Sequence, residues 1–318
     1  MKRISWSIKA LLPVACLMLL SACSADEMSS GIGEDALLTV LGLRSPIGHS
    51  EVDSRAAAGF TDITSGSMGL FLDNPAGRDN YAPKKNLKYT ASIDGLTVKW
   101  STDKRIFLVS ADAEVCAYYP YVDEYTDRNA IPLSSRVHDA AHDLVYSTVS
   151  LMNLSNTGVT FQMKRAYALI TLNIKRGNIK DDCTVKAVTF GGGLNHSAKL
   201  NITDGTMTGT VAADRGKLTF EAPELTEFTV PANSSHVKKE FLLVPLTTIL
   251  TAGLEVMFTF ADGQTASATI GISTLQAGNQ YVVNLVLNNT SMGSSVTVDK
   301  VWTSHPVDNG GDAYAPIP

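Results

Sequence analysis

The chain has 318 residues, and its 31 acidic side chains outnumber its 26 basic ones, for a net charge of −5 at neutral pH. An acidic chain lacks the basic surface that nucleic-acid phosphates require, which excludes a nucleic-acid partner. The length favours two domains of about 150 residues each.

The N-terminus has the pattern of a secretory signal. Met1-Lys2-Arg3 gives a basic start, residues 10–20 are almost wholly apolar, and Leu20-Ser21-Ala22 leads into Cys23. The small residues form a cleavage site, and the apolar stretch is too short to cross a bilayer. A cysteine at the cut can carry lipid on its sulfur, so we expect a lipoprotein signal peptide at 1–22 and lipidation of Cys23. The alternative is an ordinary signal peptide with an incidental cysteine.

A polar, glycine-rich tether at 23–35 precedes the first expected strand, Ala36–Leu43. This strand is apolar along most of its length, with Leu37, Leu38, Val40, Leu41 and Leu43. Residues 45–62 then form a loose linker with proline, glycine and three alanines, a composition that favours a loop. An isolated apolar strand followed by a linker is an unusual start for a domain.

The rest of the first half begins with a hairpin. Alternating apolar residues on both sides of Asp94-Gly95 predict it, because an Asp-Gly turn supplies the positive φ that a tight hairpin needs. Another strand is expected at Glu114–Tyr121. Its end is rich in aromatic residues, and Pro120 is expected to stop it.

Strands dominate the second half as well. Alternating apolar residues predict them in the following segments: Ala166–Lys175, Val185–Phe190, Lys199–Ile202, Phe241–Leu246, Leu254–Phe260, Tyr281–Leu287 and Ser295–Trp302. No stretch keeps a helical period, so the sequence predicts an all-β fold of the sandwich type with few short helices. The turn-rich segment Leu151–Gly158 is the expected boundary between domains at 36–157 and 158–318.

The sequence lacks the motifs of common catalytic sites, and we expect no enzyme activity, cofactor or metal. Gly191–Gly193 lacks the lysine of a phosphate-binding loop and is interpreted as a turn. His138 and His142 have the i, i+4 spacing of zinc ligands, but Asp139 stands where such motifs have glutamate. Neither a long helix nor a placed third ligand accompanies them. A polar loop is therefore favoured over the zinc site of a hydrolase.

Two cysteines remain beyond the N-terminal region, Cys116 and Cys183. Both lie in expected strands, where buried thiols behave as small apolar side chains. A disulfide between them is the open alternative.

Several segments, taken in this order, resemble the fimbrillins, the subunits of type V pili. They are Leu20–Cys23, the isolated strand with Ser54-Arg55-Ala56 after it, Val115–Tyr121, Asp143–Tyr146, Phe161–Lys175, Leu275–Leu287 and the terminal strand ending at Trp302. The resemblance spans nearly the whole chain. It implies two tandem β-sandwich-like domains, export as an outer-membrane lipoprotein, and a shaft or tip role in a cell-surface fimbria that mediates adhesion.

The resemblance also implies how subunits assemble. A trypsin-like protease cuts after an arginine beyond the first strand, and Arg55-Ala56 in the linker fits better than Arg44, which lies closer to the strand. Loss of residues 36–55 would open an apolar groove, and exposed strand edges accept strands from other chains. The donor would be residues 295–318 of another subunit, with Val296, Val298 and Trp302 as apolar contacts. The implied partners are other pilus subunits, the protease, and the membrane through the lipid.

The alternative function is a surface lipoprotein that does not polymerise and binds glycans through its β-sandwich domains, so that its partner would be a host or glycan ligand. Such domains present a flat row of aromatic rings to sugars. The only dense aromatic cluster here comprises Tyr118, Tyr119, Tyr121 and Tyr125, and at least half of it is expected in the core.

Overall fold

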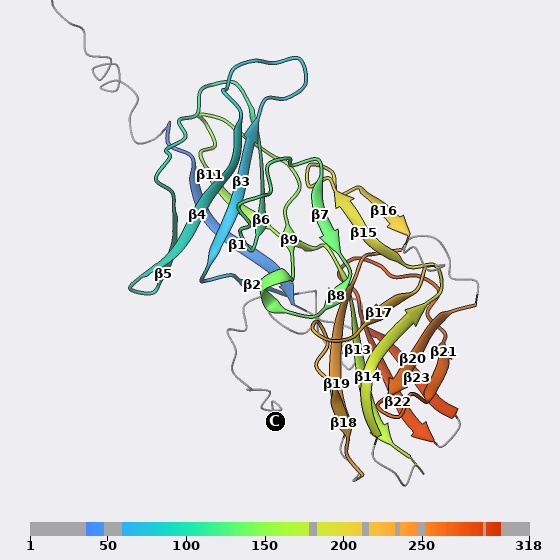
Figure 1. The fold of residues 1–318 in the computed structure, drawn as a ribbon. Helices are drawn as coiled ribbons and strands as arrows, with labels where there is room; N and C mark the ends of the chain where they lie inside the picture. Colours follow the sequence, from blue (N-terminus) through green and yellow to red (C-terminus); the bar gives the residue numbers. More distant parts are fainter. Residues whose placement is uncertain are drawn as a thin grey trace, which may run out of the picture.

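The computed structural model describes residues 36–47, 59–177, 183–211, 216–232, 236–246, 252–288 and 291–299. Over these residues the chain is almost entirely β-structure, and the turn η3 at Ala140–His142 is 3₁₀-helical. Figure 1 shows two lobes, with the blue and blue-green strands in one and the orange to red strands in the other. The sequence-based expectation of an all-β fold is confirmed.

The first lobe consists of two sheets packed face to face. The smaller sheet has the order β11-β1-β2, with β11 at Gly158–Gln162, β1 at Thr39–Ile47 and β2 at Gly59–Asp62. The larger sheet has the order β12-β9-β6-β3-β4-β5, with β10 also on β6. Its strands are β12 Lys164–Arg165, β9 Val145–Tyr146, β6 Ala113–Tyr119, β3 Ser67–Asp73, β4 Lys84–Asp94, β5 Thr97–Ser101 and β10 Ser150–Met152.

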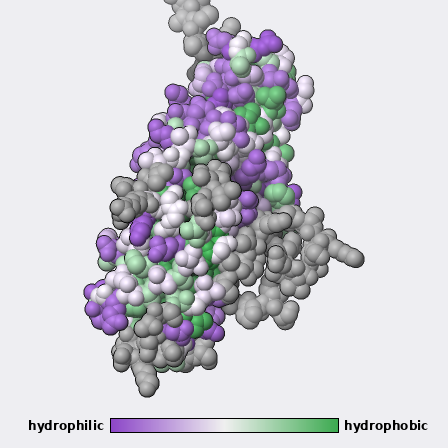
Figure 2. Space-filling model, turned by 90° about the vertical axis from the view of Figure 1, so that its right-hand side faces the viewer, coloured by the Kyte–Doolittle hydropathy of each residue, from purple (hydrophilic) through white to green (hydrophobic). Residues whose placement is uncertain are grey.

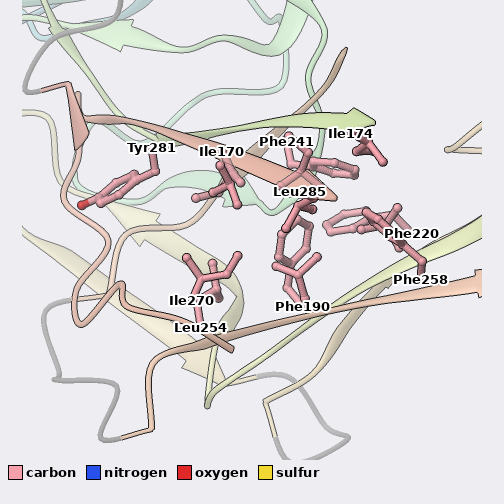
Figure 3. Packing of buried hydrophobic residues seen from close by; sticks show 14 of the residues in the cluster. Ile170, Ile174, Phe190, Phe220, Phe241, Leu254, Phe258, Ile270, Tyr281 and Leu285 are labelled. Atoms are coloured by element: carbon pink, nitrogen blue, oxygen red, sulfur yellow. The ribbon is translucent and has the colours of Figure 1, made fainter. Parts of the chain in front are cut away.

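The second lobe is a sandwich of two five-stranded sheets. One has the order β23-β22-β13-β19-β8: β23 Ser291–Asp299, β22 Gln280–Asn288, β13 Ala168–Arg176, β19 His236–Leu243 and β8 Arg136–Val137. The other has the order β17-β14-β20-β21, with β18 also on β14: β17 Leu218–Phe220, β14 Cys183–Gly191, β20 Leu254–Phe260, β21 Thr265–Ile270 and β18 Phe228–Val230. Figure 3 shows Ile170, Phe241 and Leu285 of the first sheet pointing towards Phe190 and Phe258 of the second.

A fifth sheet, of three strands, lies between the lobes. Its order is β16-β15-β7, with β16 at Met207–Val211, β15 at Asn195–Leu200 and β7 at Ile131–Ser134. Around it, a junction core joins both lobes. Phe71, Cys116 and Tyr118 of the first lobe share this core with Leu169 and Leu242 of the second.

The three longest alternating segments of the second half form strands as predicted, at β13, β20 and β22, and their alternating apolar residues face one core. The Asp94-Gly95 hairpin is confirmed by β4 and β5, with Gly95 at a φ of 63°. The strand expected from Glu114 is β6, which ends directly before Pro120.

The division into two domains at residue 157 stays a prediction, and strand pairing crosses it in both directions. β11 and β12 follow that position but pair with β1 and β9 of the first lobe. β8 precedes it but pairs with β19 of the second lobe. Such pairings follow from long-range contacts that local sequence patterns do not encode.

Cys116 on β6 and Cys183 on β14 are both buried, in different cores, and no disulfide joins them. Burial raises the pKa of the Cys116 thiol to about 12. The thiol therefore stays protonated at neutral pH and behaves as a small apolar group.

Candidate functional site at the N-terminal strand

Strand β1 is hydrogen-bonded along both edges. On one edge it runs parallel to β11, from Thr39 opposite Gly158 to Arg44 opposite Gln162. On the other edge, the residue directly before β1 pairs with the segment before β6: the Leu38 N–H donates to the Ile106 carbonyl at 2.8 Å. The end of β1 pairs antiparallel with β2 on that second edge. The strand therefore fills a slot whose two walls belong to later parts of the chain.

The inner side chains of β1 complete the core of the first lobe. Val40 and Leu43 of β1 are buried there, together with Leu38 directly before the strand. Burying three such side chains stabilises the lobe by about 5–9 kcal/mol before ordering costs, which offset much of it.

The expectation that all five apolar residues of this strand lie in the groove is wrong for Leu41, which is 61% exposed. The pairing with β11 has a bulge between Val40 and Gly42. One extra residue in a strand shifts the alternation, so Leu41 points outwards and Leu43 returns to the core. Leu37 lies at the surface edge, only partly buried, opposite Phe107.

An exposed apolar surface borders the beginning of β1. Its large exposed side chains are Leu41, Phe107, Val109 and Leu154. Leu37 and Phe107 oppose each other, and the Leu154 N–H donates to the Val109 carbonyl at 2.8 Å, so these segments adjoin. Exposed apolar side chains that gather in this way mark contact surfaces. Figure 2, which shows one face of the molecule, has hydrophilic residues over much of the upper half, with apolar ones between them.

The two candidate cleavage arginines are placed differently. Arg44 lies within β1, and its Nε is 3.4 Å from an Asp62 carboxylate oxygen of β2. Its guanidinium also lies 5.7 Å from the centre of the Phe60 ring. Arg55 lies outside the described residues, in the segment of the sequence that joins β1 to β2.

The expected donor strand is part of the monomer's own sheet. β23 is the edge strand beside β22, with Val296 opposite Val283 and Val298 opposite Tyr281. Trp302 and Cys23 lie outside the described residues. The expectation that this segment is a strand is met as far as Asp299.

The two histidines that raised the zinc question have acidic neighbours instead. His142 Nδ1 lies 3.1 Å from Asp139, and His138 Nδ1 lies 3.5 Å from Glu240. The pKa of Asp139 is held below its usual value, chiefly by the hydrogen bond that its carboxylate accepts from the Ala141 N–H and to a smaller extent by His142. Within the described residues, no group of three His, Cys, Asp or Glu side chains could hold a metal ion.

The tyrosine cluster does not form a flat exposed row. Tyr118 and Tyr119 are buried, while Tyr121 and Tyr125 are partly buried. The Tyr118 hydroxyl lies within hydrogen-bond distance of two acceptors, the Asn86 side-chain oxygen at 2.6 Å and the Val122 carbonyl at 2.8 Å, so the polar end of this buried ring is satisfied inside the protein.

Sequence reasoning missed one wall of the slot, the segment Ile106–Leu108. Its signal was present, because Ile106 and Leu108 are apolar at alternate positions and both are buried. The segment is too short and isolated to be assigned to a partner from sequence alone.

Among the described residues, no helix has the length and hydropathy to cross a bilayer.

Comparison with known proteins supports the fold. A crystal structure of a proposed cell adhesion protein from Bacteroides uniformis is 17% identical, with a TM-score of 0.55 over 84% of this chain and 99% of its own. One from Bacteroides ovatus is 14% identical, with a TM-score of 0.60 over 85% of this chain and 99% of its own. No match was found among curated proteins.

These features define a two-lobed protein of stacked β-sheets, with its N-terminal strand inserted between later ones. A family model described as fimbrillin-like matches residues 61–301, which is most of the sequence. The chain therefore belongs to the fimbrillin-like family, a family of structural adhesion proteins not known as enzymes.

Proposed function

We propose that this protein is a structural subunit, at the shaft or tip of a cell-surface fimbria, assembled by protease-triggered donor-strand exchange. It is exported as a lipoprotein anchored at the outer membrane through Cys23. A trypsin-like protease cuts after Arg55, β1 leaves its slot, and the terminal strand of another subunit enters. The assembled fibre mediates adhesion.

The observation that carries this proposal is the position of β1. It completes a core with Leu38, Val40 and Leu43, yet it stands at the N-terminal end and connects onward only through the segment that leads to β2. Its removal would leave β11 and the Ile106–Leu108 segment with unpaired backbone groups beside an apolar floor. Such a slot is a template for strand addition.

The placement of Arg44 supports Arg55, rather than Arg44, as the cut site. Proteases bind extended, exposed chain, and Arg44 is held in a strand by pairing on both edges and by its contacts with Asp62 and Phe60. A cut at Arg55 would leave β2 in the body of the protein. The freed peptide would then lose the high effective concentration that the covalent link gives it.

The exposed apolar surface beside β1 supports a contact between subunits. Leu41, Phe107, Val109 and Leu154 lie where an incoming subunit would approach the slot. A neighbour that inserts its terminal strand would cover these side chains as well as the groove.

The first prediction concerns the cut. Arg55→Lys keeps a residue that trypsin recognises, whereas Arg55→Gln removes it. After mild trypsin, the parent and Arg55→Lys should form multimers that survive unheated gel electrophoresis, and their cleaved chains should begin at Ala56. Arg55→Gln should remain a monomer with the same circular dichroism spectrum. Multimers of Arg55→Gln as abundant as those of the parent would contradict the proposal.

A further inference from the structure

Two adjoining cavities lie where the lobes meet, beside β8 and η3. The smaller, of about 160 Å³, has a wall of rings: Pro120, Tyr125, Pro132 and Tyr167. The larger, of about 480 Å³, is polar and is lined among others by His138, His196 and Glu224. Both are lined by Ser134, Arg136 and His142, so they form one cleft, here called the junction cleft. Figure 1 shows β7 and β8 at this boundary between the lobes.

Arg136 stands where the two halves of the junction cleft meet. Its backbone is fixed because β8 pairs with β19, with Arg136 opposite Leu242. Its side chain is partly buried, and its Nε is buried without a hydrogen-bond partner among the described residues. Burial raises the pKa of Tyr167 to about 12, and the nearby charge of Arg136 opposes that rise. Arg136 lines the smaller cavity together with Tyr125 and Tyr167, so it lies beside the aromatic wall.

The carboxylates around the junction cleft are already engaged elsewhere. A Glu224 oxygen accepts the Val137 N–H at 3.0 Å. Asp139 pairs with His142, and Glu240 lies 2.7 Å from the Lys238 amine. Over the described residues, no carboxylate lies within ion-pair distance of Arg136. A partly buried cation without a partner is unfavourable, and it favours an anion that enters from outside.

We propose that the junction cleft binds an acidic sugar. The ligand's carboxylate pairs with the Arg136 guanidinium, whose planar fork matches that group. One face of the sugar ring packs on Tyr125 and the prolines, since the C–H groups of a sugar meet the electron-rich face of an aromatic ring. The hydroxyls face the polar half, where Ser134, His142 and His196 offer hydrogen bonds. A pocket with an apolar wall and a few polar groups is the general form of a small-ligand site.

The two halves of the junction cleft together favour an acidic sugar over other ligands. A bare anion would use Arg136 but not the ring wall, and a neutral sugar would use the wall but leave the guanidinium unpaired. The site is independent of β1 and of the terminal strand, so it stands whether or not subunits polymerise.

The test is titration calorimetry of the intact mature chain with four probes: glucuronic acid, N-acetylneuraminic acid, glucose and acetate. At least one acidic sugar should bind, at least tenfold more tightly than glucose and acetate. Arg136→Gln should weaken that binding at least tenfold, whereas Arg78→Gln, an exposed arginine of the first lobe, should leave it unchanged.

Two more measurements keep the test decisive if Arg136→Gln folds poorly. Arg136→Lys keeps the charge without the fork and should give intermediate affinity, and Tyr125→Leu should weaken the acidic sugars but not acetate. Equal binding of acetate and acidic sugars would show a simple anion site and overturn the proposal. So would binding that survives Arg136→Gln, or an absence of binding to the parent chain.

Discussion

At the scale of single residues, Ser45 introduces an unfavourable contact where β1 packs into its slot. The Ser45 side chain is fully buried, and its hydroxyl has no hydrogen-bond partner among the described residues. An unsatisfied buried hydroxyl costs about 1–3 kcal/mol. Under the proposed strand exchange, such a defect would favour replacement of β1, because a better-matched donor could compete with it.

The second prediction follows from that hydroxyl. Ser45→Ala removes the unpaired group and should stabilise the uncut protein by about 1–3 kcal/mol, seen as a higher urea midpoint. After cleavage at Arg55, the same variant should form multimers more slowly. Thr39→Ala, at an exposed position of the same strand, serves as the control and should change neither measurement much. A lower midpoint for Ser45→Ala would mean that the hydroxyl is satisfied.

Residue-level patterns predicted burial well where alternation was regular. Ile170, Leu172 and Ile174 alternate on β13 and are all buried. The same reasoning failed at Leu41, because the bulge between Val40 and Gly42 shifts the alternation, and Gly42, a residue type that often marks a bulge, was the only local signal for it. Arg136 could not be singled out either, since its surroundings come from segments distant in the chain.

At the scale of elements, β1 and β23 are both at the ends of the described chain, and only β23 is a sheet edge. Their existence as strands could be predicted from apolar runs and turn residues. Their partners could not. The parallel pairing of β1 with β11 joins residues more than a hundred positions apart, and local propensity says nothing about such contacts.

The third prediction concerns β23 as donor. A chain that lacks residues 295–318 should fold, be cut at Arg55 and remain a monomer, because it has an acceptor slot and nothing to donate. A synthetic peptide of residues 295–318 should then bind the cut, shortened chain one to one. A peptide with Val296→Asp and Val298→Asp should not bind, since charges would enter the apolar groove. Multimers of the shortened chain would show that the donor is another segment.

At the scale of the whole molecule, the junction core makes the two lobes depend on each other. Tyr118 and Phe71 of the first lobe pack with Leu242 and Val244 of the second. Asp143 and Arg165 directly flank the junction-core residues Leu144 and Ala166 and form a buried ion pair, and breaking this pair would leave an uncompensated charge. We therefore expect the lobes to unfold together rather than one at a time.

The last prediction tests this coupling with a natural probe. Trp100 is buried in the first lobe, and its fluorescence reports on that lobe in a chain that lacks residues 1–22, and with them Trp6, and carries Trp302→Phe. In that background, Leu285→Ala removes a fully buried side chain from the second lobe and should cost about 2–5 kcal/mol. If the junction core couples the lobes, the urea midpoint seen by Trp100 should fall as far as the midpoint seen by circular dichroism. Val286→Ala, the neighbouring and less buried position on β22, should shift both midpoints little. A Trp100 midpoint that stays at the parent value while the circular dichroism midpoint falls would show that the lobes unfold independently, and that the junction core is a contact between separate folding units.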